Sequence, residues 1–353
     1  MEPIENPEGF RYTVEPINPA YAGLWKLYEK AKESQWTENE LAIEIQSDYG
    51  KFANLSPDVQ KYLKNTVAFF AVSDGAVVET AGVLASRIPA REFKIWYNHQ
   101  SMMEDIHGII YSQLVNAYIP AEERGIVFEA IKTFPFINAK MAWIKKWVGE
   151  ERLPLESREI VIIKKLLKNP EHKDLLQKIN ESEKPIAQII LANVITEGLF
   201  FSGSFCSIFW FNHYYKGYLP GLAKSNEWIS RDETMHTDVS VLIYQSYIKN
   251  KLPIESVHEM FREAVEIESA FVCDSLPNGL KGINAVSATQ YIKFVADLLL
   301  VDLKLPKLYG VSNPFSWMLK QSISTRIPDF FADRAVSEYG TSVDDGFDFD
   351  EDF

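Results

Sequence analysis

Three residues of one predicted helix have the types and spacing for metal chemistry. Glu104, His107 and Tyr111 stand three and then four residues apart, so they share one face of an α-helix. A carboxylate and an imidazole three residues apart can reach one metal ion, and a phenol one turn further on would lie beside it. The stretch 100–114 therefore predicts a metal-binding helix that carries an oxidisable side chain.

The same spacing occurs a second time. Glu233 and His236 repeat the pattern, and an isolated carboxylate in an apolar segment precedes each pair. These carboxylates are Asp74 in the first half of the chain and Glu197 in the second. Four carboxylates and two imidazoles form the ligand set of ferritin-like di-metal proteins, and they suit iron or manganese. Taken singly, Asp74 also fits a turn and Glu197 a bond to a core hydroxyl, but metal binding accounts for both buried charges.

A third match to the spacing has a simpler interpretation. Glu255 and His258 follow Pro253, which is typical of the first turn of a helix. No isolated carboxylate in an apolar segment precedes this pair. We expect it to lie on the surface, outside any metal site.

Composition limits the classes of function. The 353 residues are 46% hydrophobic and contain no Gly/Ser-rich or Pro-rich linker, which favours one domain. The net charge of −13 argues against nucleic acid and anionic membranes as partners. Cys206 and Cys273 form no pair motif, and the first residues do not resemble a secretory signal. Together these features predict reduced thiols and a cytoplasmic protein.

One stretch has the length of a membrane span. Residues 186–211 contain Glu197 as their only charge, so a single membrane helix is an alternative. We expect no second candidate of that length. Six polar residues dilute the stretch, and a helix at the centre of a large bundle is also hydrophobic all round. Burial in a bundle is the favoured interpretation.

The hydrophobic periodicity predicts an all-α protein with a ferritin-like helical bundle and additional helices. Asn18 is a candidate cap for a first α-helix that contains Leu24 and Ala31 and ends near residue 35. Thr37 is a candidate cap for a short turn, and Ser56 for the next helix. Helices are expected at about 57–86, 91–118, 121–133, 136–149, 155–168, 185–212, 221–249, 254–273 and 284–304. This bundle would end near residue 335.

The tail 336–353 differs from the rest of the chain. It has no basic residue, and acidic residues surround Phe347, Phe349 and Phe353. Such a segment cannot fold alone. It is either a solvated acidic end or a peptide that docks through its phenylalanines.

A buried di-metal site can store iron, oxidise a bound substrate with O₂, or oxidise part of the protein itself. Tyr111 favours the third possibility, because a phenol beside the metals is the nearest oxidisable group. Phe201, Phe205 and Ile229 are placed to form a dry wall around it, although each is equally an ordinary core residue. The main alternative is a di-iron oxidase or monooxygenase that acts on a separate small substrate. A non-enzymatic iron store is a further alternative.

The chain resembles the small, radical-generating subunit of class I ribonucleotide reductase from about residue 10 onward. The matching segments are Ser-Asp-Gly at 73–75, Glu-x-x-His-x-x-x-Tyr at 104–111, Glu-Gly-Leu-Phe-Phe-Ser-Gly-Ser-Phe at 197–205, Ile-Ser-Arg-Asp-Glu-x-x-His at 229–236, Gln-Tyr-Ile-Lys-Phe-Val-Ala-Asp at 290–297 and Asn-Pro-Phe at 313–315. The segment 79–100 is less similar to the family.

The resemblance implies a role for each candidate residue. One metal would be held by Asp74, Glu104 and His107, and the other by Glu197, Glu233 and His236. Tyr111 would carry a stable radical.

The resemblance also implies a route for electrons. The near-surface Trp36 would connect through Asp232 to His107, with Glu40 near the subunit interface. Tyr339 in the tail would pass the radical onward.

The resemblance further implies cofactors and partners. These are two iron ions per chain, with manganese as an alternative, a homodimer, and a large subunit bound by the C-terminal tail. The chain has no Cys pair or Gly-rich phosphate loop, so the nucleotide site would belong to that large subunit.

Overall fold

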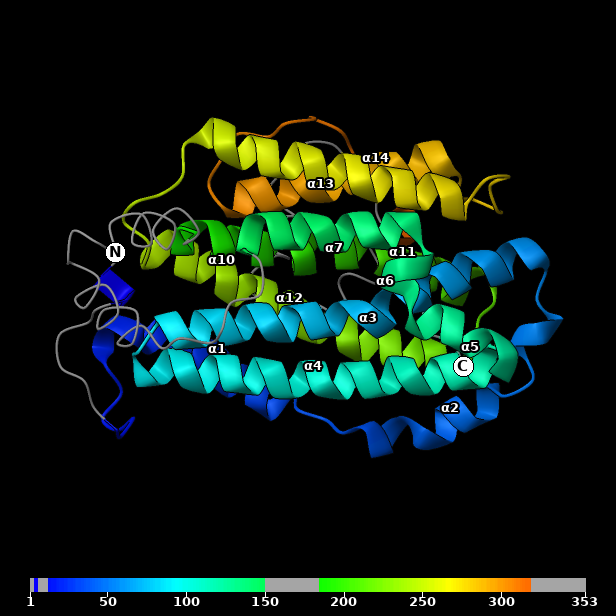
Figure 1. The fold of residues 1–353 in the computed structure, drawn as a ribbon, viewed down its shortest axis with the longest axis horizontal. Coiled ribbons are helices and arrows are strands. Elements are labelled where there is room, and N and C mark those ends of the chain that lie inside the picture. The colour runs from blue at the N-terminus through cyan, green and yellow to red at the C-terminus, as the bar shows by residue number, and fades with distance from the viewer. Residues whose placement is uncertain (1–2, 6–11, 150–183, 319–353) are drawn as a thin grey trace, which may run out of the picture.

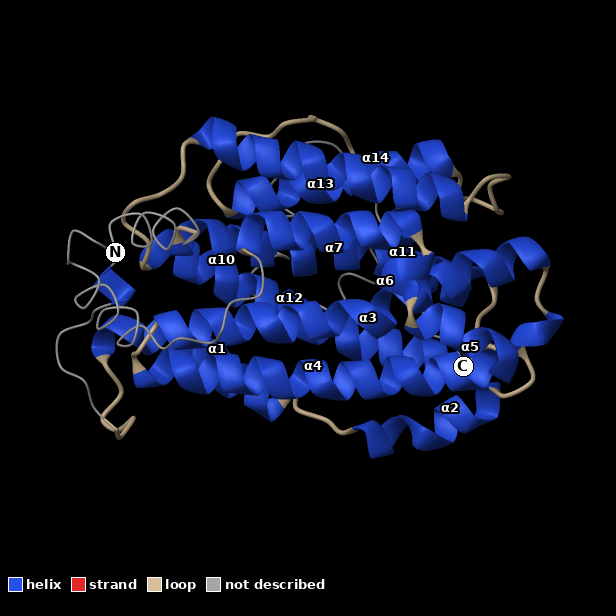
Figure 2. Cartoon of the chain, in the orientation of Figure 1, coloured by secondary structure: helices blue, strands red, loops and turns tan. Residues whose placement is uncertain are grey.

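The computed structural model describes residues 3–5, 12–149 and 184–318. Every regular element in these ranges is helical (Figure 2), apart from an isolated antiparallel bridge between Leu280 and Ile283. The all-α prediction is therefore confirmed. The expected helix 155–168, the tail 336–353 and its Tyr339 lie outside the described residues.

Short elements lead into the bundle, and two of the predicted caps occur among them. The Asn18 side chain accepts a hydrogen bond from the backbone N–H of Ala20 and so caps a 3₁₀ turn instead of the first α-helix. Thr37 and Glu40 form a capping box. The elements are η1 (Pro3–Glu5), η2 (Pro19–Tyr21), α1 (Ala22–Glu33), η3 (Glu38–Leu41), α2 (Ala42–Asp48) and η4 (Phe52–Asn54).

Two long helices form the first half of the core. Helices α3 (Pro57–Arg87) and α4 (Arg91–Tyr118) pack side by side as a hairpin (Figure 1). The expected single helix at 121–133 is wrong. It is split into α5 (Ala121–Phe128) and α6 (Ala130–Thr133), because Glu129 has φ −98° and ψ 28°, outside the helical region. Helix α7 (Pro135–Val148) follows.

The second half centres on one long, irregular helix. The sequence predicts a regular helix over 185–212, but the structure has α10 (Ile186–Ile195), a π-helical segment η6 (Thr196–Phe201) and α11 (Ser202–Tyr214). Helix α12 (Pro220–Ser246) packs against all three. Helices α13 (Ile254–Ser275) and α14 (Ala285–Asp302) pack together along one edge of the bundle (Figure 1).

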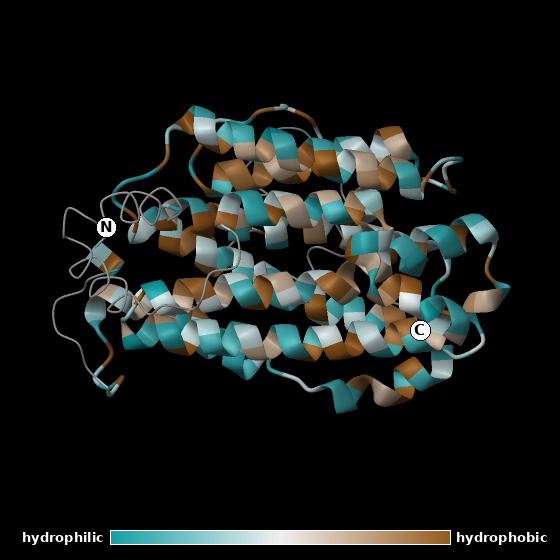
Figure 3. Cartoon of the chain, in the orientation of Figure 1, coloured by the Kyte–Doolittle hydropathy of each residue, from teal (hydrophilic) through white to brown (hydrophobic). Residues whose placement is uncertain are grey.

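Within the described ranges, two helices are long and apolar enough to cross a membrane by length and composition. They are Ile186–Tyr214, whose most apolar window is 94% buried, and Pro57–Arg87, whose window is 56% buried. The expectation of no second candidate is thus wrong, because most charges of α3 lie near its ends. Packing against neighbouring helices accounts for the first segment, and Figure 3 shows hydrophilic and hydrophobic residues mixed along the visible helices.

Candidate metal centre

Four elements bring the six predicted ligands together in the middle of the bundle. One ligand comes from α3, two from α4, one from η6 and two from α12. All six side chains are buried: Asp74, Glu104, His107, Glu197, Glu233 and His236. A cluster of this kind far from water is costly unless its charges are neutralised.

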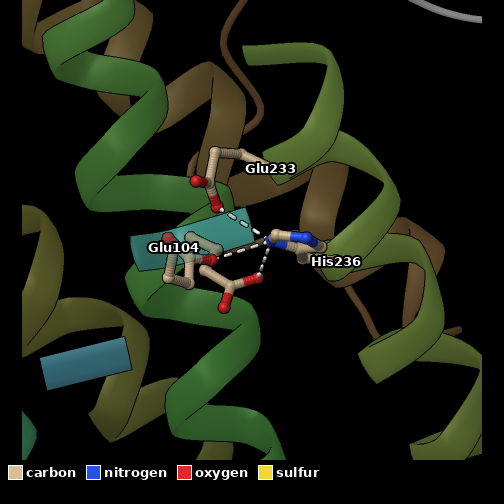
Figure 4. A group of neighbouring side chains, drawn as sticks. Glu104, Glu233 and His236 are labelled. Atoms are coloured by element: carbon tan, nitrogen blue, oxygen red, sulfur yellow. Dashed lines mark ion pairs between the residues drawn. The ribbon is translucent and has the colours of Figure 1, made fainter. Parts of the chain in front are cut away.

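Glu104 and Glu233 lie between the two histidines. His107 Nδ1 is 3.3 Å from Glu104 Oε2 and 3.0 Å from Glu233 Oε1. His236 Nδ1 is 2.9 Å from Glu104 Oε1 and 3.4 Å from Glu233 Oε2 (Figure 4). Each of these carboxylates can therefore serve two ions, an arrangement that the separate spacing of the two motifs does not reveal.

The remaining two carboxylates flank this pair. Glu197 Oε2 is 3.9 Å from His236 Nδ1, and its Oε1 accepts a 2.6 Å hydrogen bond from Gln100. Ligand atoms of Glu104, Glu197, Glu233 and His236 all lie within 4.8 Å of one another. Asp74 stands outside this group, and the neighbouring charge of Glu104 acts on it. Gln100 is missed by the sequence analysis, although it lies one helical turn before Glu104.

Burial and neighbouring charges shift the pKa of these groups in opposite directions. Burial raises the pKa of Asp74, and Glu104 raises it further. Burial raises the pKa of Glu104, but hydrogen bonds from His107 and His236 outweigh it and lower that pKa to about 2. Burial lowers the pKa of both histidines, but their hydrogen bonds to carboxylates raise both values well above the usual range. Divergent pKa values in one buried cluster are typical of functional sites.

The donor atoms fit divalent metal ions. Both oxygens of Asp74 and Oε2 of Glu197 are buried without a hydrogen bond to the described residues. Buried polar atoms normally have a partner, and a hard cation that binds carboxylate and imidazole would supply one. These residues therefore fit a metal centre, and their oxygen-rich composition suits iron or manganese.

The π-helical segment η6 shapes one side of the centre. Glu197 lies inside it, and the Thr196 side chain donates a 2.8 Å hydrogen bond to the carbonyl oxygen of Ala192. Such segments widen a helix locally and are frequent at functional sites. The hydrophobic pattern does not reveal this π-helical segment, because residues 186–201 are almost uniformly apolar and show no change of period at 196.

Asp232 connects the centre to Trp36. Its Oδ2 accepts a 2.6 Å hydrogen bond from Trp36 Nε1 and lies 3.2 Å from His107 Nε2. The Trp36 ring also stacks on the His107 ring at 5.8 Å. Because Asp232 holds Nε2, the other ring nitrogen of His107 faces the carboxylates, as a metal ligand requires. Trp36 is only 3% exposed, and Trp228 packs on it at 5.3 Å.

Tyr111 is buried in an aromatic environment beside the centre. Phe70 stacks on its ring with centroids 4.5 Å apart and an interplanar angle of 8°. Phe201 and Phe205, expected as a wall, contact Phe70 at 5.4 and 4.8 Å. Burial raises the pKa of Tyr111, and Asp74 raises it further. Sequence analysis missed the stacking of Phe70, which stands one turn before Asp74.

The other sequence candidates lie apart from the centre. Glu255 is 79% exposed and lies in the first turn of α13, whereas a ring nitrogen of His258 is 3.0 Å from the carbonyl oxygen of Pro306. The prediction that this third pair lies at the surface is confirmed for Glu255. Glu40 is exposed and accepts a hydrogen bond from the backbone N–H of Thr37.

Comparisons with known proteins identify the family of this chain. The family model described as "Ribonucleotide reductase, small chain" matches residues 14–314. The ribonucleoside-diphosphate reductase small chain of Plasmodium falciparum (isolate Dd2) is 38% identical over 343 residues, covering 97% of this chain and 86% of the relative. The small chain of Trypanosoma brucei brucei is 37% identical over 342 residues, covering 96% and 89%.

A solved structure extends the comparison to the fold. The Rnr4 homodimer of Saccharomyces cerevisiae matches with a TM-score of 0.71 and 27% identity, covering 96% of this chain and 93% of that chain. Sequence, fold and the carboxylate–histidine cluster lead to the same assignment. The protein belongs to the ribonucleotide reductase small-chain family and is a small subunit of this oxidoreductase.

Proposed function

We propose that this subunit generates a radical on Tyr111 at a centre of two metal ions, and delivers it to a large subunit that reduces ribonucleotides to deoxyribonucleotides. The observation that carries the proposal is the position of Tyr111. Its ring is fully buried and stacked on Phe70, and the charge of Asp74 raises the pKa of its phenol. Family membership favours this function over oxidation of a separate small substrate.

We propose iron as the metal, with manganese as the alternative. The two ions would be held by the six buried ligands, with Glu104 and Glu233 facing both imidazoles. These ligands are Asp74, Glu104, His107, Glu197, Glu233 and His236. The bound ions would supply two of the four electrons that reduce O₂ fully. Tyr111 would supply a third electron and lose its phenol proton, which the reduced oxygen would take up. An external donor would supply the fourth electron through Trp36.

The surrounding residues position these groups and exclude water. Asp232 fixes the orientation of His107 and connects Trp36 to the centre through one carboxylate oxygen. Phe70 covers one face of the Tyr111 ring, which would protect a radical from water and reductants. The phenol oxygen of Tyr111 is buried and has no hydrogen-bond partner among the described residues.

Replacement of Tyr111 tests the proposal. Protein loaded anaerobically with Fe(II) and exposed to O₂ should give a tyrosyl signal in electron paramagnetic resonance. Tyr111→Phe should keep metal uptake, measured by mass spectrometry, and lose the signal. Metal uptake without any such signal in the unmodified chain, repeated with manganese and a reductase, would instead favour a substrate oxidase.

The remaining roles rest on the family. We propose a homodimer, because the yeast relative is described as one, and a cytoplasmic location, because both cysteines are free. We also propose a radical-generating domain at 1–335 and a tail at 336–353 that binds the large subunit, with Tyr339 passing the radical. Removal of 336–353 should abolish large-subunit binding in a pull-down while leaving the tyrosyl signal intact.

A further inference from the structure

A fully buried ion pair lies on the far side of the aromatic residues around Tyr111. Lys140 Nζ on α7 is 2.6 Å from Glu268 Oε2 on α13, and neither side chain is exposed. The ammonium group also lies between two rings, 3.6 Å from the centroid of Phe69 and 3.8 Å from that of Phe271. This pair has no part in the metal centre.

Stability alone does not account for this pair. Burial lowers the pKa of Lys140 to about 8 and raises that of Glu268, so the interior opposes both charges. An apolar pair of similar volume is often as stable as a buried ion pair or more so. The Glu268 side chain also packs against Gly203, where a Cβ would overlap Glu268 Oε1. We therefore ask which neighbouring side chains this ion pair holds in position.

The ion pair reaches Tyr111 through two layers of rings. Lys140 contacts Phe69, whose ring is 5.4 Å from Phe70 and 5.6 Å from Phe201. Phe70 in turn stacks on Tyr111. A cation held over a ring favours one position of that ring. Aliphatic side chains in place of the ion pair would not favour any one position of the Phe69 ring.

We propose that the Lys140–Glu268 pair is a positioning device that fixes Phe69, and through it the aromatic wall that shields Tyr111. This inference rests on the proposed radical function. Neither residue touches the reacting atoms, so their effect is on the orientation and protection of Tyr111.

The test replaces both charges at once. Lys140→Met/Glu268→Leu removes the pair without leaving one charge unpaired, and Lys146→Met/Glu263→Leu is the control. That control pair joins the same two helices at 2.5 Å, but its side chains are 52% and 30% exposed. Both double variants should fold and take up metal.

Two measurements separate positioning from general stability. Decay of the tyrosyl signal in hydroxyurea should be about five-fold faster in the core variant, with altered hyperfine splitting, and unchanged in the control. In metal-free protein, hydrogen exchange of the segment 66–74 should rise about ten-fold in the core variant only. If the core variant fails to fold, Phe69→Leu replaces it, because it removes the ring that the ammonium group fixes.

Each outcome has one interpretation. Unchanged decay, splitting and exchange in the core variant would overturn the positioning role. Absence of a tyrosyl signal in the unmodified chain would count against the proposed function, while the exchange measurement would still decide whether the ion pair holds the aromatic wall.

Discussion

At the scale of the residue, three carboxylates each contact two functional side chains. One carboxylate oxygen of Asp232 serves both Trp36 and His107. Two other carboxylates, Glu104 and Glu233, each face both histidines. These shared carboxylates connect the two histidines to each other and to Trp36, so a change at one residue is expected to affect its neighbours.

Trp36→Phe should separate metal binding from radical formation. The ring stack on His107 can persist, but the hydrogen bond to Asp232 is lost. A hydrogen bond to a charged group contributes about 1.5–3 kcal/mol to stability. If its loss raises the barrier to electron transfer by about 1.4 kcal/mol, the rate falls about ten-fold. We expect normal iron content and about ten-fold slower formation of the tyrosyl signal in stopped-flow spectroscopy.

A matched tryptophan provides the control. Trp25 Nε1 donates a 3.1 Å hydrogen bond to Glu29 on the surface of α1, so Trp25→Phe should leave the rate unchanged. Equal rates in the Trp36 and Trp25 variants would show that the bond to Asp232 is not part of the electron route.

Metal binding should release protons and strengthen as pH rises. In the metal-free chain the pKa values of His107 and His236 are raised. Protonation therefore stabilises that chain fully below about pH 6.5, and the contribution is lost as pH rises through the raised values. Because a ligating nitrogen must lose its proton, binding should release at least about two protons per chain.

Calorimetry in two buffers of different ionisation enthalpy measures this release. Manganese affinity should increase between about pH 6 and about pH 8. His258→Asn, outside the centre, should behave as the unmodified chain. Affinity independent of pH would contradict the protonated state of the two buried histidines.

At the scale of the element, the start of α12 is fixed by a close approach to α2. The Asp48 carboxylate accepts hydrogen bonds from the backbone N–H groups of Gly221 and Leu222, at 3.2 and 3.0 Å. A Cβ on Gly221 would lie 2.6 Å from the Cα of Ile45. Helix α12 carries two of the ligands, so this contact helps to set the position of the metal centre.

Gly221→Ala should therefore destabilise the protein. The added methyl meets backbone that cannot rotate away, and overpacking of this kind costs about 3 kcal/mol. Urea denaturation should show the loss, together with reduced metal content. Gly125→Ala, where nothing lies within 4 Å, should be neutral or more stable by up to about 1 kcal/mol. Similar midpoints for both variants would argue against a tight contact between α2 and α12.

The sequence predicted the helices and the local faces, but not how one helix is aligned against another. Glu104 and His107 share a face because helical spacing alone sets it. The stacking of Phe70 on Tyr111 and the bond from Gln100 to Glu197 depend on the packing of separate helices. No local pattern specifies those alignments.

The π-helical segment and the break at residue 129 were unpredictable for a similar reason. An apolar run is compatible with either an α-helical or a π-helical backbone, and tertiary packing decides between them. At 129 the backbone leaves the helical region although no Gly or Pro stands there. Here the surrounding helices, more than local preference, determine the path of the chain.

At the scale of the whole molecule, an apolar face of the α3–α4 hairpin remains exposed. Met102 and Ile109 lie on one side of α4 and are 38% and 45% exposed. Gly75 and Gly82 on α3 are also exposed, with no neighbouring atom within 4 Å. A second copy of the chain would cover such a face, in keeping with the proposed homodimer.

Ile109→Glu should convert a dimer to a monomer. A carboxylate in the centre of an apolar interface would be buried without a partner. Sedimentation velocity should show half the mass of the unmodified protein, with helical content unchanged. Ile254→Glu, at a 49% exposed site on α13, is the control and should remain dimeric. A dimer that persists in the Ile109 variant would place the interface elsewhere.

The long central helix has a consequence for synthesis of the protein on the ribosome. The segment Ile186–Tyr214 is 94% buried over its most apolar window, and helices α12, α13 and α14, which help to cover it, all follow it in the sequence. Helices α3 and α7 also pack on it and precede it, but a nascent chain would still present part of this apolar surface before α12, α13 and α14 have emerged. Unfinished chains with exposed apolar surface aggregate readily, so chaperone capture should be greatest while the last third of the protein is being translated.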